Sequence, residues 1–355
     1  MPNSKALIDT LLLAPIERHA LLASRNSRRK AFACYLAMRE KVSEDFLPLV
    51  SSAVPFVNDH SRGHLERVLS HIETILSRHF AKPSSQSEDI PEGRLLTWPD
   101  TLILLNALVW HDIGNMYGRK GHAAKVKDCL KQVSGLLYDD HLAQYIIQVA
   151  EAHSGDGAIE RVIPSCHAVG SYESQDIHLQ FLAAVLRFAD ELDEDHRRCT
   201  PQWRELNLVP EESRRFWYFC RVNSSIQVKS VAGDHNFNHE VEINSHVPES
   251  EFGLEFKAEQ GTVHAMAEYF KRVFKLERER TYCNAYLRTA YYHPGIARIK
   301  VHLRTQEGQN PPRSSDNYEF ELSDGKQPES LLGIENLAKL RPYLNEALNR
   351  KDESL

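Results

Sequence analysis

The stretch Ala107–Asn115, "ALVWHDIGN", decides which fold can be expected for this chain. It is an apolar helical run that ends in His111 and Asp112, and we expect Gly114, just after them, to end the helix. With 18 histidines and 18 aspartates in 355 residues, chance alone supplies roughly one His-Asp dipeptide. The pair therefore needs support from the rest of the chain before it indicates a site.

Composition predicts a globular protein without a strong nucleic-acid signature. The 355 residues suffice for two domains, and 42% hydrophobic residues can build an ordinary core. Lys and Arg number 43 against 49 Asp and Glu, for a net charge of −6. A dedicated nucleic-acid binder would carry a strong positive excess, although a local basic groove is compatible with this balance.

Cysteine spacing and the apolar segments predict a cytoplasmic protein. The six cysteines lie far apart and contain no C-x-x-C pair, which favours a reducing compartment. The N-terminus lacks a small-residue cleavage site, and the longest apolar run, "LILLNALVW", is far too short to span a bilayer. We therefore expect no membrane association.

Residues 1 to about 205 predict a helical domain. In 61–80 the apolar residues recur at three- and four-residue steps, with Ser61 as a plausible N-cap. Further helices are expected over 98–113, 121–137, 139–153 and 177–195. The segment 81–94 is rich in Pro, Ser and charged residues and predicts a loop, as does the stretch between the last two helices.

Residues 206–355 predict a smaller α+β domain of unassigned role. Runs such as "RFWYFCRV", "SIQVKSVA", "HEVEINSHV", "ARIKVHLRT" and "NYEFELSD" are β-branched or aromatic with partial alternation, which is typical of strands. Two helices, at about 258–281 and 330–349, are interleaved with them. The fold class expected is therefore mainly α, with an α+β region after the helical bundle.

Histidines are concentrated in the helical region, since 11 of the 18 fall between residues 60 and 196. Several acids and histidines lie at or near the ends of apolar helical segments. Buried polar groups need partners, and an ion can satisfy several imidazoles and carboxylates together. The residues with this placement are His64, His111, Asp112, His122, His153 and Asp190.

This pattern resembles the H…HD…D signature of the HD-domain metal-dependent phosphohydrolases, over about residues 55–196. The matching stretches are "HLERV" at His64, "HD" at His111 and Asp112, and "FADELD" at Asp190. The element "NDHSRGH" and the β-containing extension resemble the branch of HD proteins with a C-terminal extension. Such proteins resemble components of bacterial stress or phage-defence modules, which is an analogy of fold alone.

The resemblance implies a metal site and assigns roles to individual residues. His64, His111, Asp112 and Asp190 would hold a divalent transition metal. Imidazoles with carboxylates suit Mn²⁺, Fe²⁺, Co²⁺, Ni²⁺ or Zn²⁺ better than Mg²⁺. A metal lowers the pKa of its water and polarises phosphoryl oxygens, so that attack on phosphorus needs no protein nucleophile.

His122 and His153 resemble the additional histidines that many members carry between the doublet and the final aspartate. Two readings stay open at this point. Either they bind a second ion, which makes the number of ions one or two, or they serve with Asp112 in catalysis as a proton donor and a phosphate contact. Candidate phosphate-binding residues, chosen because cationic donors neutralise phosphoryl charge, are Arg62, Arg119, Lys120 and Arg187.

Neighbouring residues have weaker claims to the site. His60 adjoins the motif and is as well explained by a cap or a hydrogen bond as by metal binding. Asp193 and Asp195 are expected at the acidic end of a solvated helix, although Asp193 could exchange roles with Asp190. His167 lies in the loop after His153 and could line the same pocket.

Together these features predict hydrolysis of a phosphate ester or anhydride, with a nucleotide as the expected substrate, by a metal-activated water. An HD-type nuclease acting on single-stranded nucleic acid is a rival, which the charge balance favours less. A second rival is a non-catalytic regulator that senses a nucleotide and docks a protein partner. Self-association or partner binding through the C-terminal domain is left open.

Overall fold

The computed structural model describes residues 24–53, 59–77, 96–119, 121–133, 135, 137–153, 162–199, 209–231, 238–258, 261–290, 293, 295–305 and 317–349. The chain divides into two compact units. The first comprises Met1–Pro55, His60–Asp190 and Cys283–His293, and the second comprises Phe56–Asp59, Glu191–Tyr282 and Pro294–Leu355. The domain boundary near residue 205 stays a prediction.

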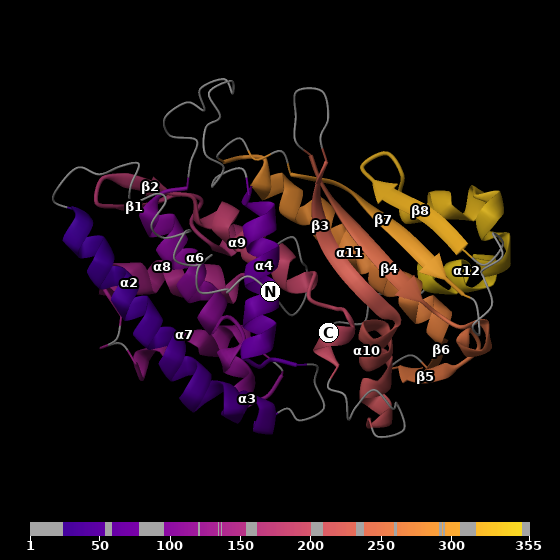
Figure 1. Ribbon diagram of the computed structural model, residues 1–355, viewed down its shortest axis with the longest axis horizontal. Helices are drawn as coiled ribbons and strands as arrows, with labels where there is room; N and C mark the ends of the chain where they lie inside the picture. The colour runs from indigo at the N-terminus through magenta and orange to yellow at the C-terminus, as the bar shows by residue number, and fades with distance from the viewer. Residues whose placement is uncertain are drawn as a thin grey trace. The chain divides into compact units, whose positions relative to one another are not determined.

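Helices build the first unit, which confirms its expected class. Its elements, in indigo to magenta in Figure 1, are α2 (Ser24–Lys41), η1 (Val42–Phe46), α3 (Leu47–Ala53), α4 (Arg62–Ile75), α6 (Trp98–Trp110), η2 (Ile113–Tyr117), η3 (Ala123–Lys125), α7 (Val126–Lys131), α8 (Asp140–Glu151), η6 (Ile163–Ser165), β1 (Gly170–Tyr172), β2 (Gln175–Ile177) and α9 (Leu179–Glu191).

Helix α6 is the centre of this unit. All of its residues are buried, and it contacts α2, α4 and α8. It begins at a capping box, in which Thr97 and Asp100 satisfy each other's backbone N–H groups. Because α6 is buried on all sides, apolar residues lie on all of its faces and it is not amphipathic. His111 and Asp112, at its C-terminal end, therefore lie in the interior of the bundle.

The amphipathic helices around α6 follow their sequence pattern closely. Helix α4 begins after Ser61, whose Oγ accepts a hydrogen bond from the Gly63 N–H at 3.1 Å, as the N-cap expectation required. Its buried face carries His64, Leu65, Val68, Leu69, His71, Ile72 and Ile75. The helices expected at 139–153 and 177–195 are confirmed as α8 and α9.

Several expectations for this unit were too simple. The helix expected over 121–137 is split into η3 and α7, which ends at Lys131. The loop after α8 contains a β-hairpin, β1–β2, whose turn residues Glu173 and Ser174 have positive φ. Such a two-residue hairpin lacks the Asn-Gly signal that would have announced it. The loop expected at 81–94 lies outside the described residues.

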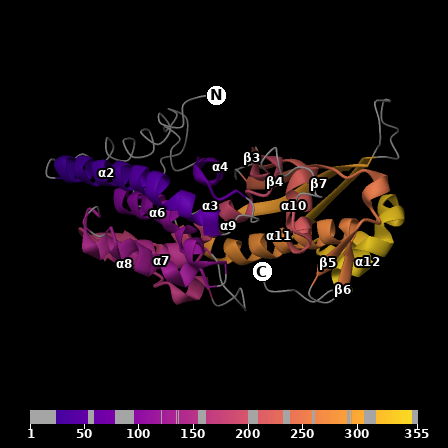
Figure 2. The same cartoon turned by 90° about the horizontal axis from the view of Figure 1, so that it is seen from below.

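The second unit combines a four-stranded sheet with helices and a small hairpin (Figure 2), in agreement with the expected α+β character. Its elements are η7 (His196–Arg198), α10 (Glu211–Val222), β3 (Asn223–Val231), β4 (Asn238–His246), η10 (Glu249–Glu251), β5 (Glu255–Ala258), β6 (Gly261–His264), α11 (Ala265–Leu287), β7 (Ile296–Arg304), β8 (Asn317–Ser323), η12 (Pro328–Gly333), η13 (Glu335–Leu340) and α12 (Arg341–Asn349).

The sheet has the order β3-β4-β7-β8, in which β4 and β7 are parallel and the other pairs are antiparallel. Helix α11 makes the crossover between the parallel strands and packs against the apolar face, where Phe270 meets Phe320 and Tyr269 hydrogen-bonds Ser245 at 2.8 Å. The opposite face carries charged cross-strand pairs, such as Lys229 with Glu242.

Three expectations for the second unit were wrong. The helix expected over 330–349 is an α-helix only from Arg341 on, because the 3-10 helices η12 and η13 occupy the residues before it. The aromatic run "RFWYFCRV" belongs to helix α10 rather than to a strand. Strands β5 and β6 form a hairpin before α11, which begins at Ala265 instead of near 258. The other four runs are strands of the sheet, as expected. No helix within the described ranges combines the length and apolar character that crossing a bilayer demands.

The burial of Glu73 on α4 should make the stability of the protein depend on pH. Burial raises the pKa of Glu73 from 4.5 to about 7, because its carboxylate loses hydration on folding. The unfolded chain therefore ionises this group first, and stability falls as the pH rises from about 4.5 through 7. Replacing Glu73 by Gln should stabilise the protein at pH 8 by on the order of 1 kcal/mol, allowing for partial exposure, and change little at pH 4.5.

Urea denaturation of the full chain at the two pH values measures this difference. The matched control is Glu44→Gln, which makes the same substitution at an exposed position. Equal effects of Glu73→Gln at pH 4.5 and pH 8 would contradict the expectation.

Candidate metal centre

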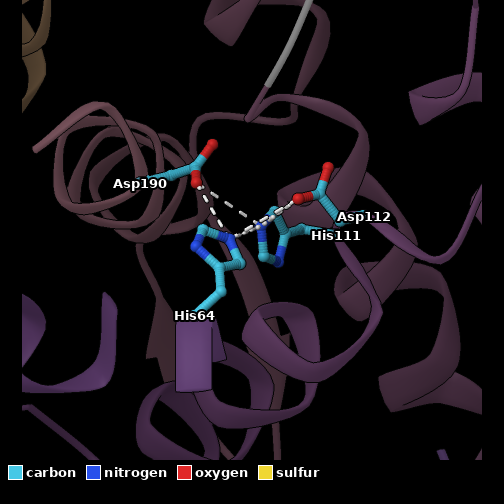
Figure 3. A group of neighbouring side chains, drawn as sticks. All are labelled: His64, His111, Asp112 and Asp190. Atoms are coloured by element: carbon cyan, nitrogen blue, oxygen red, sulfur yellow. Dashed lines mark hydrogen bonds and ion pairs between the residues drawn. The ribbon is translucent and has the colours of Figure 1, made fainter. Parts of the chain in front are cut away.

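Two imidazoles and two carboxylates converge in the interior of the first unit (Figure 3). The Nε2 atoms of His64 and His111 lie 3.3 Å apart. The Oδ2 atom of Asp112 is 3.2 Å from His111 Nε2, and the Oδ1 atom of Asp190 is 3.3 Å from His64 Nε2. One ligand atom from each of these residues lies within 4.8 Å of every other. The four residues expected to form a metal site are thus brought together.

Each of these side chains is placed by a helix end or a helix face. His64 lies in the first turn of α4, just after the Ser61 cap. His111 is the C-cap residue of α6, and Asp112 follows it at the start of η2. Asp190 lies in the last turn of α9. Three helices therefore supply the group, which is why sequence neighbours alone could not form it.

A second group shares the carboxylate of Asp112. Its Oδ1 atom lies 3.4 Å from His122 Nε2 and 3.6 Å from His153 Nε2, and the two imidazole nitrogens are 3.2 Å apart. Asp112 thus faces the first group with Oδ2 and the second with Oδ1. Each group could hold a divalent cation, and Asp112 belongs to both groups.

The tautomers of three histidines are fixed by one repeated contact. His111, His122 and His153 each place Nδ1 against the carbonyl oxygen three residues earlier, in Leu108, Arg119 and Ala150 respectively. A carbonyl only accepts, so Nδ1 carries a proton in all three, and in the neutral imidazole that binds a metal Nε2 keeps its lone pair. All three Nε2 atoms face the shared carboxylate, as metal ligands require.

The imidazoles and carboxylates of the two groups stabilise one another's charges. Burial opposes charge on the acids, but the neighbouring imidazoles outweigh it and hold the pKa values of Asp112 and Asp190 well below the usual range. Burial likewise opposes charge on His111, yet the two carboxylates raise its pKa well above the usual value. For His153 burial prevails and lowers the pKa to about 4, so that its imidazole is neutral at pH 7.

Gly114 does not end helix α6, although the sequence led us to expect this. It lies inside η2 rather than ending α6, and its φ is not positive. A Cβ built on it would lie 1.8 Å from the carbonyl oxygen of His122. Glycine is therefore needed because the backbone carrying His122 passes directly over η2. This close approach brings the second group up to Asp112.

The candidate phosphate-binding residues are placed unequally. Arg62 is exposed and pairs with Glu66 at 3.2 Å, and Arg119 is exposed beside His122. Arg187 is buried and donates a hydrogen bond to the carbonyl oxygen of His153 at 3.2 Å, so it ties α9 to the end of α8. Lys120 lies outside the described residues, and substrate contacts of all four stay predictions.

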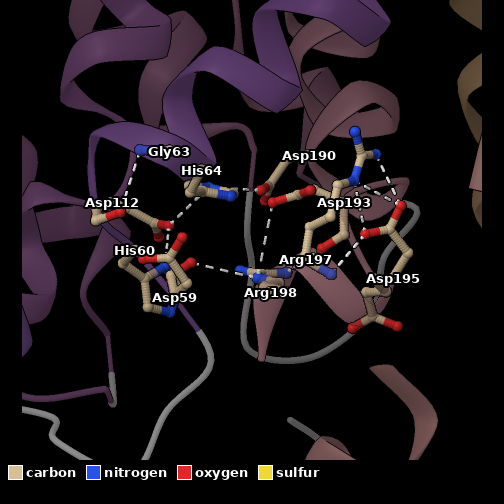
Figure 4. Close-up of polar contacts among 12 residues, drawn as sticks. Asp59, His60, Gly63, His64, Asp112, Asp190, Asp193, Asp195, Arg197 and Arg198 are labelled. Carbon is tan, nitrogen blue, oxygen red and sulfur yellow. Dashed lines mark hydrogen bonds and ion pairs between the residues drawn. The ribbon is translucent and has the colours of Figure 1, made fainter. Parts of the chain in front are cut away.

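His60 belongs to the site more closely than its spacing indicated. Its Nδ1 atom lies 2.6 Å from Asp112 Oδ2, and both side chains are buried (Figure 4). The H-x-x-x-H spacing before α4 was the available signal, but it could not identify a partner 52 residues away. Sequence reasoning assigned no contact to Asn115 either, although its Nδ2 atom donates to Asp112 Oδ1 at 2.9 Å.

Asp193 and Asp195 do not end a solvated helix. Both are buried, and both fall in the second unit. Asp195 is the N-cap of η7 and pairs with Arg197 at 2.7 Å, while the Asp193 carbonyl oxygen accepts a hydrogen bond from Arg198 (Figure 4). Neither is among the candidate metal-ligand groups of the described residues. His167 is exposed in the loop after α8.

Comparison with known proteins identifies a family. The family model HD-CE matches residues 54–275, which is more than half of the 355 residues. The match confirms the resemblance to HD proteins, and it contains both candidate ligand groups and part of the second unit. No curated protein and no solved structure matches the chain.

Replacing Gly114 by Ala tests the close approach of His122. The added methyl group has no room against a backbone carbonyl, so we expect a loss of roughly 1–3 kcal/mol in the free energy of unfolding. Urea denaturation followed by circular dichroism measures the loss. Gly135→Ala is the matched control, because nothing lies within 4 Å of a Cβ added there. Equal stability of the two variants would show that the contact is unimportant.

Proposed function

Since the chain belongs to the HD-CE family, we propose that it is a metal-dependent phosphohydrolase that cleaves a phosphate ester or anhydride, with nucleotides as the substrate class. The observation that carries the proposal is the convergence of four imidazole Nε2 atoms and two carboxylates in two adjoining groups. Imidazole with carboxylate is a donor set for Mn²⁺, Fe²⁺, Co²⁺, Ni²⁺ or Zn²⁺.

The residues present fit such ions. His64, His111, Asp112 and Asp190 would hold the first ion, and Asp112, His122 and His153 would hold a second. A divalent ion supplies Lewis acidity there, which polarises a phosphoryl oxygen and lowers the pKa of its water. The Nδ1 hydrogen bonds to backbone carbonyls keep the imidazoles in the tautomer that ligation needs.

Of the two readings left open for His122 and His153, metal binding is the one we adopt. With a pKa of about 4, His153 is neutral at pH 7, and its one ring proton lies on Nδ1, where the Ala150 carbonyl oxygen accepts it, so Nε2 has no proton to donate. Its Nε2 atom is also turned toward Asp112 and His122. Asp112 would then be a ligand common to both groups.

The chain's own residues contribute orientation and exclusion of water. His64 and His111 are fully buried, and Asp112 is 5% exposed, so the ligands keep their geometry without competition from solvent. Of the candidate cations, Arg62 and Arg119 are accessible to a phosphate, whereas Arg187 positions His153. The cysteine spacing favours a reducing compartment, so we propose that the protein acts in the cytoplasm.

Substitution of Asp112 by Ala should abolish both metal uptake and hydrolysis, because it removes a ligand from both groups. Wild-type protein is loaded with Mn²⁺ and assayed for phosphate release from nucleotides and cyclic nucleotides and for cleavage of single-stranded nucleic acid. In parallel, a metal at a hundred times its Kd should stabilise wild-type protein by about 2.7 kcal/mol, and the variant not at all.

The control is His141→Ala, an exposed histidine on α8, which should leave metal uptake and turnover intact. Turnover retained by Asp112→Ala would contradict the assignment. Cleavage of single-stranded nucleic acid alone would favour a nuclease. Nucleotide binding by fully metal-loaded protein without turnover would favour a sensing regulator.

A further inference from the structure

We propose that His60 and Asn115 are positioning residues that each fix one carboxylate oxygen of Asp112, and so assign that oxygen to one of the two ligand groups. The inference rests on the proposed function, in which the two groups bind metal ions. It adds a role for two buried residues that are not themselves candidate ligands among the described groups.

His60 holds the oxygen that faces the first group. Its Nδ1 atom is 2.6 Å from Asp112 Oδ2, and the side chains are only 3% and 7% exposed. An ionised carboxylate accepts and cannot donate, so Nδ1 of His60 is the donor. The same Oδ2 atom lies 3.2 Å from His111 Nε2 and 3.5 Å from His64 Nε2. His60 therefore restrains the oxygen shared with these two histidines.

Asn115 holds the other oxygen. Its Nδ2 atom donates to Asp112 Oδ1 at 2.9 Å, and the residue is fully buried. Its backbone N–H also donates to the Asp112 carbonyl oxygen at 3.0 Å, which closes the turn between them. Oδ1 is the atom that faces His122 and His153. Asn115 thus restrains the side of the carboxylate that belongs to the second group.

The two contacts together prevent rotation of the carboxylate. Each oxygen has about two acceptor positions, of which one is used by a hydrogen-bond donor and the other is left for a ligand interaction. A turn of the carboxylate about its Cβ–Cγ bond would break two charge-assisted hydrogen bonds in a buried site. Both oxygens of Asp112 are therefore held in place by the protein itself, and loss of either hydrogen bond should affect its own group first.

The experiment uses two background variants, each of which keeps only one of the two ligand groups intact. His153→Ala leaves the first group intact, and His64→Ala leaves the second. Mn²⁺ binding to the full chain is measured by electron paramagnetic resonance of the free ion. In the His153→Ala background, His60→Ala should weaken binding about ten- to a hundredfold, and Asn115→Ala should change it less than about threefold. In the His64→Ala background the order should be reversed.

A conservative variant distinguishes positioning from packing. In His60→Asn the amide nitrogen occupies the place of Nδ1, bonded to Cγ, and can still donate to Oδ2. Affinity for Mn²⁺ should therefore return to within about threefold of the background. His71→Ala is the matched control, since it removes another buried imidazole from the same unit. Circular dichroism verifies that each variant is folded.

Three outcomes would overturn the positioning roles. One is an unchanged affinity in His60→Ala, and another is an equal effect of both substitutions in each background. The third is a nitrogen coupling to bound Mn²⁺ that disappears with His60, since that would make it a ligand. A wild-type protein that takes up no Mn²⁺ would instead overturn the proposed function, and this inference with it.

Discussion

The buried carboxylate of Asp112 is the interaction on which the polar interior of the first unit depends. An isolated carboxylate buried in an apolar bundle is strongly unfavourable, and partners must compensate for the lost hydration. Here the partners are imidazoles from four parts of the chain, with nitrogen atoms 2.6 to 3.6 Å from one or other oxygen. They are His60, His64, His111, His122 and His153.

This dependence explains the architecture around the carboxylate. Helix α6 is buried on all sides and ends where its chain turns polar, so it carries His111 and Asp112 into the interior. The start of α4 and the ends of α8 and α9 lie near this point, so that His64, His153 and Asp190 reach the two ligand groups. Arg187 supports this arrangement from α9, because it binds the carbonyl oxygen at the end of α8. The same helices thus form the apolar core and place the residues of the polar group.

Local sequence pattern predicted the parts of the fold that local physics controls. Helices α4, α8 and α9 have strong 3.6-residue periodicity, and the ligands His64 and Asp190 lie on helices of that kind. The failures occurred where tertiary packing decides. The aromatic run in α10 is compatible with a strand by composition, yet it follows Pro210 and forms an amphipathic helix. Short hairpins without turn signals were missed for the same reason.

Partners of Asp112 were harder to predict than the ligands themselves. His60 is separated from Asp112 by 52 residues, and no periodicity relates them. Asn115 is only three residues away, but its contact depends on η2 being a tight 3-10 turn rather than a continuation of α6. Gly114 was assigned to a helix end because glycine is common there. Its true reason, the backbone of His122 above it, exists only in three dimensions.

The repeated Nδ1 contacts to carbonyl oxygens have an evolutionary consequence. In His111, His122 and His153 the partner is the main chain of the residue three positions earlier, not its side chain. Every amino acid offers that carbonyl, so the orientation of the imidazoles survives substitution at Leu108, Arg119 and Ala150 as long as the turn is kept. Related chains can therefore diverge at these positions, and change what surrounds the site, without losing the geometry of its histidines.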